Sequence, residues 1–251
     1  MLTQPTLDQL RELRFHGMLQ ALEEQDNTPD CASLSFEERF ALLVEREYIE
    51  RQNRRLTNRL RKAKFPMQAA VEDINFRHPR GLSKSGAIPL FSCQWIRSHD
   101  NLIFTGPTGT GKTYLACAFG QKACREDFSV LYLRLPRLFD ELAIARGDGR
   151  YPRLLATFAK TDLIILDDWG IAPFSHEQRH DLFEILEDRY AKRSTIVAAQ
   201  FPIKHWHEII ADPTLADAIL DRLVHNAHKF NLKGDSMRKK RTPSSSPDNK
   251  V

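Results

Sequence analysis

The sequence has few of the features that mark secreted, membrane or zinc-binding proteins. Its four cysteines, Cys31, Cys93, Cys117 and Cys124, form no Cys-x-x-Cys pair and have no histidine at ligand spacing, which argues against a zinc site or a disulfide framework. No apolar run approaches the about 18 residues of a membrane-spanning helix, and no signal-peptide pattern opens the chain. We therefore expect a cytoplasmic protein with no membrane partner.

Acidic residues are missing from one basic stretch. Residues 51–64 contain seven arginine or lysine residues and no aspartate or glutamate, although the formal net charge of all 251 residues is only +4. On a helical wheel Ile49, Leu56 and Leu60 fall on one side. The other side carries Arg51, Arg54, Arg55, Arg59, Arg61 and Lys62. A solvated helix face is the alternative, but such faces usually mix charge signs, so we predict that these six residues contact nucleic acid.

The remaining pattern divides the chain into a helical part and an α/β part. Leucines at helical spacing predict a helix over 6–25, and Ser35 with Glu38 forms a capping box that opens a second helix, up to about Pro66. After a connector over 66–100, strands are predicted at 101–106, 129–135, 162–168, 194–200 and 228–233. Helices at 111–126, 136–147, 176–192 and 215–228 lie between them, which predicts a parallel α/β sheet. We expect domains over 1–66 and 67–241 and a disordered tail over 242–251.

A glycine-rich octapeptide follows the first of these strands and opens a helix. It reads Gly106, Pro107, Thr108, Gly109, Thr110, Gly111, Lys112, Thr113 and matches G-x-x-x-x-G-K-[ST]. The glycines let backbone N–H groups point at phosphates, and the N-terminal end of the helix adds positive partial charge. We expect Lys112 to reach the β- and γ-phosphates and the Thr113 hydroxyl to ligate Mg²⁺. The octapeptide thus predicts that the chain binds a nucleotide with magnesium.

Two aspartates, Asp167 and Asp168, end the strand over 162–168. A phosphate-binding loop needs a carboxylate at the end of an adjacent strand, so we expect Asp167 to hold Mg²⁺ through water. We expect Asp168 to orient or deprotonate the attacking water. Two adjacent aspartates at a buried strand end are costly without a cation, which favours a metal site over a structural role.

Three further polar residues are candidates for contact with the γ-phosphate. Gln200 ends the strand over 194–200, where it could lie between the carboxylates and the γ-phosphate, or could simply start a loop. Arg222 and Arg238 follow in the chain. From spacing alone, either arginine could approach a γ-phosphate or be an ordinary surface residue.

These motifs, with the segments ADAILDRLVHNAHKFNLKGDSMRK and LRELRFHGMLQALEEQ, resemble the IstB family over about residues 6–240. Members are AAA+ helper ATPases of transposons that work beside the transposase IstA, and their relatives include DnaC and DnaA. The resemblance implies an AAA+ core with strand order 5-1-4-3-2, a small helical N-terminal domain, DNA binding and ATP-dependent self-assembly. It gives Gln200 the sensor-1 position, Arg222 the arginine-finger position and Arg238 the sensor-2 position. Most AAA+ proteins carry Asp-Glu in place of Asp167-Asp168, a departure that bears on the hydrolysis rate.

Three functions compete on this basis. The leading hypothesis is an ATPase that assembles on target DNA as a homo-oligomer, with ATP sites between subunits, and recruits or stimulates an IstA-type transposase. A DnaC-like helicase loader would use the same core, but it needs an apolar helicase-binding surface in the N-terminal domain, where this chain has a basic face. A small-molecule kinase is disfavoured, because no arginine-rich lid-like insertion covers the phosphates.

Overall fold

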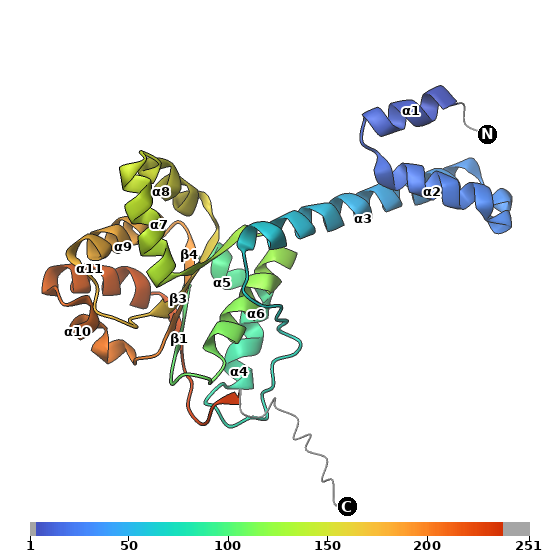
Figure 1. Cartoon of the computed structure of the whole chain (residues 1–251). Helices are drawn as coiled ribbons and strands as arrows, with labels where there is room; N and C mark the ends of the chain where they lie inside the picture. Colours follow the sequence, from blue (N-terminus) through green and yellow to red (C-terminus); the bar gives the residue numbers. More distant parts are fainter. Residues whose placement is uncertain (1–3, 238–251) are drawn as a thin grey trace, which may run out of the picture. The chain divides into compact units, whose positions relative to one another are not determined.

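The computed structural model describes residues 4–237 (Figure 1). Contacts divide the chain into two compact units between residues 59 and 60, within the long helix α3 (Phe36–Ala63). The roles expected of residues 1–66 and 67–241 stay predictions. Arg238 and the expected tail over 242–251 lie outside the described residues. In the described part, no helix has both the length and the apolar character needed to cross a membrane.

The described part of the first unit contains helices only. These are α1 (Gln4–Glu12), α2 (His16–Asn27), a 3-10 turn (Pro29–Ser33) and most of α3. The single helix expected over 6–25 is wrong, because the chain breaks between α1 and α2, where Arg14 has a left-handed φ of 60°. The expected capping box is confirmed: the Glu38 N–H donates to Ser35 Oγ at 3.2 Å, and the Ser35 N–H donates to Glu38 Oε2 at 2.8 Å.

A buried glutamate joins α2 to α3. Glu47 is only 4% exposed, and its carboxylate accepts the N–H groups of Gly17 at 2.8 Å and Met18 at 3.2 Å. These two donors belong to the first turn of α2 and have no partner within that helix. A Cβ at position 17 would lie 2.6 Å from Glu47 Cα, so the close approach requires glycine. Arg51 completes the group, because its Nε donates to Glu47 Oε1 at 2.6 Å and its guanidinium lies over the Phe15 ring.

The second unit is built on a sheet of five parallel strands in the order β2-β3-β4-β1-β5. The strands are β1 (Asn101–Thr105), β2 (Val130–Arg134), β3 (Leu163–Trp169), β4 (Ser194–Ala199) and β5 (Ala227–Asn231). Read from the other edge, this order is 5-1-4-3-2, so the expected topology is confirmed. Because all five strands run the same way, their carboxyl ends meet at one edge of the sheet.

Helices cover both faces of this sheet (Figure 1). Ile103 of β1 belongs to an apolar core shared with α7 (Leu135–Gly147), α8 (Tyr151–Lys160), α9 (His176–Arg189), α10 (Trp206–Ile210) and α11 (Pro213–Val224). The next residue, Phe104, packs against Phe119 of α6 (Lys112–Arg125) with ring centroids 5.8 Å apart. Short helices α4 (Lys84–Ala87) and α5 (Gln94–Arg97) precede the sheet. The sequence did not predict α8, whose Pro152 suits a loop equally well but here occupies the first helical turn.

Candidate nucleotide site

The phosphate-binding loop, residues 106–113, leaves β1 at the carboxyl edge and enters α6. Gly106, Gly109 and Gly111 all have positive φ, at 142°, 88° and 94°. A Cβ at Gly109 would lie 2.2 Å from Ser236 Oγ, so this position requires glycine. Lys112 Nζ donates to the carbonyls of Gly106 at 2.8 Å and Pro107 at 2.9 Å. A phosphate would offer this ammonium a charged acceptor in their place, so the loop fits a nucleotide.

Asp167, near the end of β3, is the carboxylate expected to hold magnesium. It is 4% exposed, and its Oδ2 accepts the Thr113 hydroxyl at 2.8 Å and the Tyr132 hydroxyl at 2.6 Å. Within residues 4–237, no lysine or arginine forms an ion pair with Asp167. A buried carboxylate without a counter-charge is unfavourable, and a hydroxyl beside it supplies a second oxygen ligand. The residues present therefore fit a Mg²⁺ ion between Thr113 and Asp167.

Tyr132 of β2 is a site residue that the sequence analysis missed. Burial and the hydrogen bond to Asp167 raise the pKa of Tyr132, so the phenol stays a donor at neutral pH. It fixes the orientation of the carboxylate that would face the metal. The sequence did contain a signal for Tyr132. It is a polar side chain on β2, and β2 was expected to pair with β3, the strand that carries the two aspartates.

Asp168 projects from an irregular position at the same edge. Its φ is 61°, and the pairing of β3 with β4 shifts between Leu166 and Trp169, as in a β-bulge. Its carboxylate accepts Arg134 Nε at 2.6 Å, and this contact raises the pKa of Arg134. Arg134 is the last residue of β2, and the sequence analysis missed it too. The end of the strand that neighbours β3 was a position from which a side chain could reach Asp168.

Gln200 follows β4, the strand between β1 and β3. The carbonyl of the preceding Ala199 accepts the Gly106 N–H at 3.2 Å, which ties this strand end to the start of the phosphate-binding loop. Gln200 thus lies at the carboxyl edge, half-buried, between the strand that leads to the loop and the strand that carries Asp167 and Asp168. Its contact with a γ-phosphate remains a prediction.

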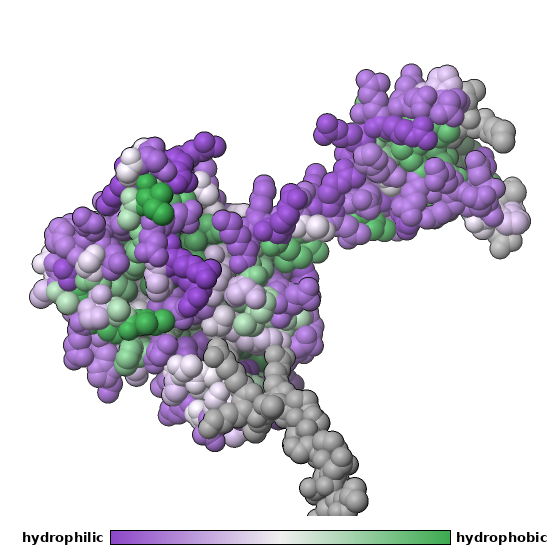
Figure 2. All heavy atoms as spheres, in the orientation of Figure 1, coloured by the Kyte–Doolittle hydropathy of each residue, from purple (hydrophilic) through white to green (hydrophobic). Residues whose placement is uncertain are grey.

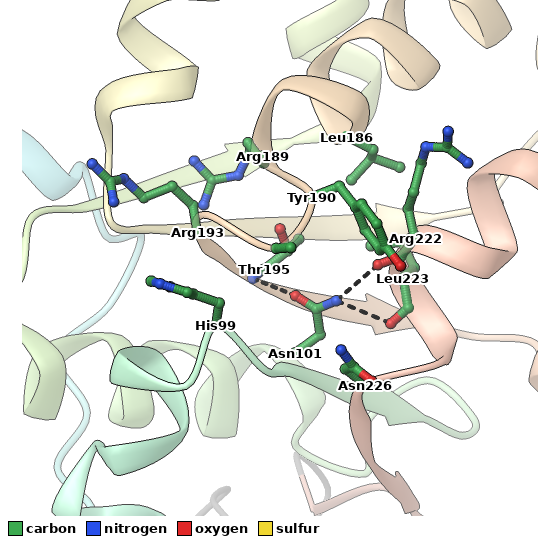
Figure 3. A pocket seen from close by; sticks show the side chains of 11 residues that line it. His99, Asn101, Leu186, Arg189, Tyr190, Arg193, Thr195, Arg222, Leu223 and Asn226 are labelled. Atoms are coloured by element: carbon green, nitrogen blue, oxygen red, sulfur yellow. Dashed lines mark hydrogen bonds between the residues drawn. The ribbon is translucent and has the colours of Figure 1, made fainter.

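Arg222 lies near Asn101, at the amino ends of the strands, whereas the phosphate-binding loop follows their carboxyl ends (Figure 3). Asn101, the first residue of β1, donates through Nδ2 to the backbone carbonyls of Arg222 at 3.1 Å and Leu223 at 3.2 Å. The length of β1, about 13 Å at roughly 3.3 Å per residue, therefore separates this region from the loop that follows Thr105. The Arg222 guanidinium is paired with Glu187, and its contact with a γ-phosphate remains a prediction.

The six predicted DNA-binding residues share α3 but have different surroundings. Arg54, Arg55, Arg61 and Lys62 are exposed, and Arg59 is half-buried. Arg54 has Glu50 at 3.7 Å. Arg51 is also exposed, but it is held by Glu47 and Phe15, which gives it a structural role within the first unit. DNA contact by these residues remains a prediction.

Residues 8–245 match the family described as IstB-like ATP binding protein. The chain belongs to this family. It is 53% identical over 239 residues to a putative insertion sequence ATP-binding protein, y4pL, of Sinorhizobium fredii, covering 95% of this chain and 98% of that protein. It is 49% identical over 203 residues to the insertion sequence IS1162 putative ATP-binding protein of Pseudomonas fluorescens, covering 80% and 88% of the two chains. This IstB-like chain is thus similar to ATP-binding proteins of insertion sequences over nearly its whole length.

The solved structures similar to this IstB-like chain share its fold. DnaI superposes with a TM-score of 0.55 at 22% identity, covering 66% of this chain and 92% of that one. The DnaC helicase loader superposes with a TM-score of 0.51, also at 22% identity, covering 62% and 93%. These likenesses show that the second unit has the same α/β fold as those proteins.

Proposed function

We propose that this chain is a DNA-dependent ATPase that acts in transposition. It binds MgATP, assembles on double-stranded DNA as a homo-oligomer, and recruits or stimulates an IstA-type transposase. The observation that carries the proposal is the hydrogen bond of 2.8 Å between Thr113 and the buried Asp167, at the edge where the phosphate-binding loop starts. Membership of a family whose relatives are named for insertion sequences supplies the biological setting.

Each residue of the site has a defined task in hydrolysis. Backbone N–H groups of residues 106–113 bind the phosphates, and Lys112 leaves its carbonyl contacts to bind the β- and γ-phosphates. Thr113 and Asp167 would hold Mg²⁺, which would neutralise charge on the phosphates. Asp168 orients the attacking water and accepts its proton. Gln200 holds the γ-phosphate from the end of β4, and Arg238 contacts it as a second sensor.

Assembly links this site to a neighbouring subunit and to DNA. Arg222 lies too far from its own loop to contact its own nucleotide, so we assign it to the γ-phosphate of the adjacent subunit. An arginine suits this task because its charge is fixed and its planar fork matches phosphate oxygens. Arg54, Arg55, Arg59, Arg61 and Lys62 contact the DNA backbone, and hydrolysis of the shared ATP releases the assembly.

A helicase loader remains the second candidate because of the surface of the first unit. Exposed apolar atoms lie among the hydrophilic ones there (Figure 2). On α3, Phe36 is 68% exposed and Tyr48 63% exposed, and Phe40 stacks on Phe36 with ring centroids 5.9 Å apart. Exposed aromatic side chains of this kind favour a protein partner, which a transposase or a helicase could equally supply.

ATP hydrolysis by the full chain, measured with and without duplex DNA, tests the proposal. We expect duplex DNA to stimulate hydrolysis, and a non-hydrolysable ATP analogue to strengthen DNA binding. Lys112→Ala should lose both effects. If duplex DNA neither binds nor stimulates hydrolysis, while a replicative helicase does stimulate it, the loader is correct and the transposition role is wrong.

A further inference from the structure

A buried arginine lies against the phosphate-binding loop without a role in the site described above. Arg80, in the segment before α4, is only 2% exposed. Its Nη1 donates to the Thr110 carbonyl at 3.1 Å and to Met237 Sδ at 3.2 Å. A Cβ at Gly111 would lie 2.5 Å from the same Nη1, so only glycine admits the guanidinium at this position.

The charge of Arg80 is not balanced by the rest of the chain that the structure describes. Within residues 4–237 it forms no ion pair with aspartate or glutamate, and its Nε is buried without a hydrogen-bond partner. Burial lowers the pKa of Arg80. A buried cation that lacks a counter-charge is unfavourable, so an anion from outside the chain is the natural partner.

Arg189 provides the contrast within the same chain. It is 1% exposed, and its two terminal nitrogens donate to four backbone carbonyls. These belong to Phe158, Thr161, Asp162 and Ser194. The Nε of Arg189 is also buried without a partner, but its four carbonyl acceptors give Arg189 a structural task. Arg80 has one carbonyl acceptor and the thioether of Met237.

Backbone contacts hold Arg80 in place beside the loop. The Lys233 N–H donates to the Arg80 carbonyl at 2.9 Å, and the Met237 N–H donates to the Gly109 carbonyl at 2.9 Å. The segment that follows β5 therefore connects the backbone of Arg80 to that of the loop. The guanidinium is fixed at Thr110 and Gly111, where the loop enters α6.

We propose that Arg80 binds the α- and β-phosphates that ATP and ADP share, as a second cation beside Lys112. This inference rests on the proposed nucleotide function. The backbone of such a loop binds the α- and β-phosphates, and Arg80 contacts that backbone at Thr110. The guanidinium donates in a planar fork, and its Nε is a donor that no group of the described chain accepts from.

Arg80→Met tests the proposal, because it keeps the length of the side chain and removes the charge. Affinities of the full chain for MgATP and MgADP are measured by calorimetry, and the melting temperature is measured without nucleotide. We expect both affinities to fall by a similar factor, about tenfold to hundredfold, as for a lost charged hydrogen bond. We also expect the nucleotide-free melting temperature to stay level or rise, because an unpaired buried charge has been removed.

Controls separate this inference from the proposed function. The parental chain must bind MgATP and Lys112→Ala must not; failure there contradicts nucleotide binding itself. Arg189→Lys should lower the melting temperature and leave both affinities unchanged. Unchanged affinities in Arg80→Met would overturn the proposal, and so would a loss confined to MgATP, which would make Arg80 a γ-phosphate residue. If Arg80→Met does not fold, Arg80→Lys decides by the same affinities, with a smaller loss expected.

Discussion

Arg134 Nε donates to the carboxylate of Asp168 at 2.6 Å, joining the ends of two neighbouring strands at the carboxyl edge of the sheet. Asp168 is the residue to which we assign the attacking water. A carboxylate held by a guanidinium is turned from other hydrogen-bond partners. We therefore predict that Arg134 must release Asp168 before hydrolysis.

Arg134→Ala should raise basal ATP hydrolysis in the absence of DNA. The pair is partly exposed, and such pairs contribute at most about 1 kcal/mol, so the increase should reach about fivefold. Steady-state phosphate release at saturating MgATP measures it. A lower basal rate in Arg134→Ala, with MgATP binding intact, would mean that Arg134 assists hydrolysis.

Asp168→Asn should bind MgATP with parental affinity and hydrolyse it about 10²–10⁴-fold more slowly, because a general base is lost while Thr113 and Asp167 remain. Nucleotide affinity and single-turnover hydrolysis are the two measurements. Asp148→Asn, at an exposed aspartate paired with Arg150, is the matched control and should change neither. Parental hydrolysis by Asp168→Asn would contradict the role of this carboxylate.

Changing Arg54, Arg55 and Arg59 together to alanine should weaken binding to all duplexes alike, because phosphate contacts carry no sequence information. The slope of log K against log salt should become shallower by about 0.9 for each lost contact. Arg51 is left intact, since its loss would disturb Glu47 and Phe15. Arg125→Ala, at an exposed arginine paired with Glu72, is the control for net charge. An unchanged slope in the triple variant would make this helix face merely solvated.

The first unit should lose stability in acid because of Glu47. Burial alone would raise its pKa, but hydrogen bonds from Arg51, Met18 and Gly17 lower it below the ordinary value. A lowered pKa stabilises the folded state above the ordinary glutamate pKa of about 4.3, and this contribution disappears as the pH falls through the folded value. Glu47→Gln should lose about 1–3 kcal/mol at neutral pH and show a weaker acid dependence. Thermal melts of the parental chain and of Glu47→Gln, from neutral pH to below the glutamate pKa, check this prediction. An equal loss of stability in acid for both proteins would contradict the stabilising role of the Glu47 carboxylate.

Local chemistry made much of this site predictable from the sequence. The octapeptide over 106–113 and the pair Asp167-Asp168 combine residue type with a strand context, and the structure brings Thr113 to Asp167 as expected. Tyr132, Arg134 and Arg80 were missed, because their tasks depend on which strands and segments become neighbours. In the sequence, a tyrosine or arginine that folding brings close to a site cannot be told from any other strand or loop residue.

In the fold, too, local features were predictable and features that depend on distant residues were not. Strands β1 to β4 were predictable because each is a short apolar run bounded by turn residues or by a helix, whereas β5 mixes polar residues with the buried Phe230. The break between α1 and α2 was not predictable, because the acceptor for the first N–H groups of α2 is Glu47, thirty residues from Gly17. Arg222 could not be assigned to either edge from spacing alone; the hydrogen bonds of Asn101 fix that region at the amino edge.

A mixture of two inactive variants tests the central claim, that the nucleotide site is completed by a neighbouring subunit, most directly. Arg222→Ala should bind MgATP and hydrolyse it poorly, since an arginine supplied by a partner can contribute roughly 10³–10⁵ in rate. Lys112→Ala should retain Arg222 but bind no nucleotide. Mixed on duplex DNA, the two should regain partial hydrolysis, with a maximum near equal amounts, because some contacts pair an intact loop with an intact Arg222. If Arg222→Ala assembles normally and the mixture stays inactive at every ratio, the site is not shared and the account is wrong.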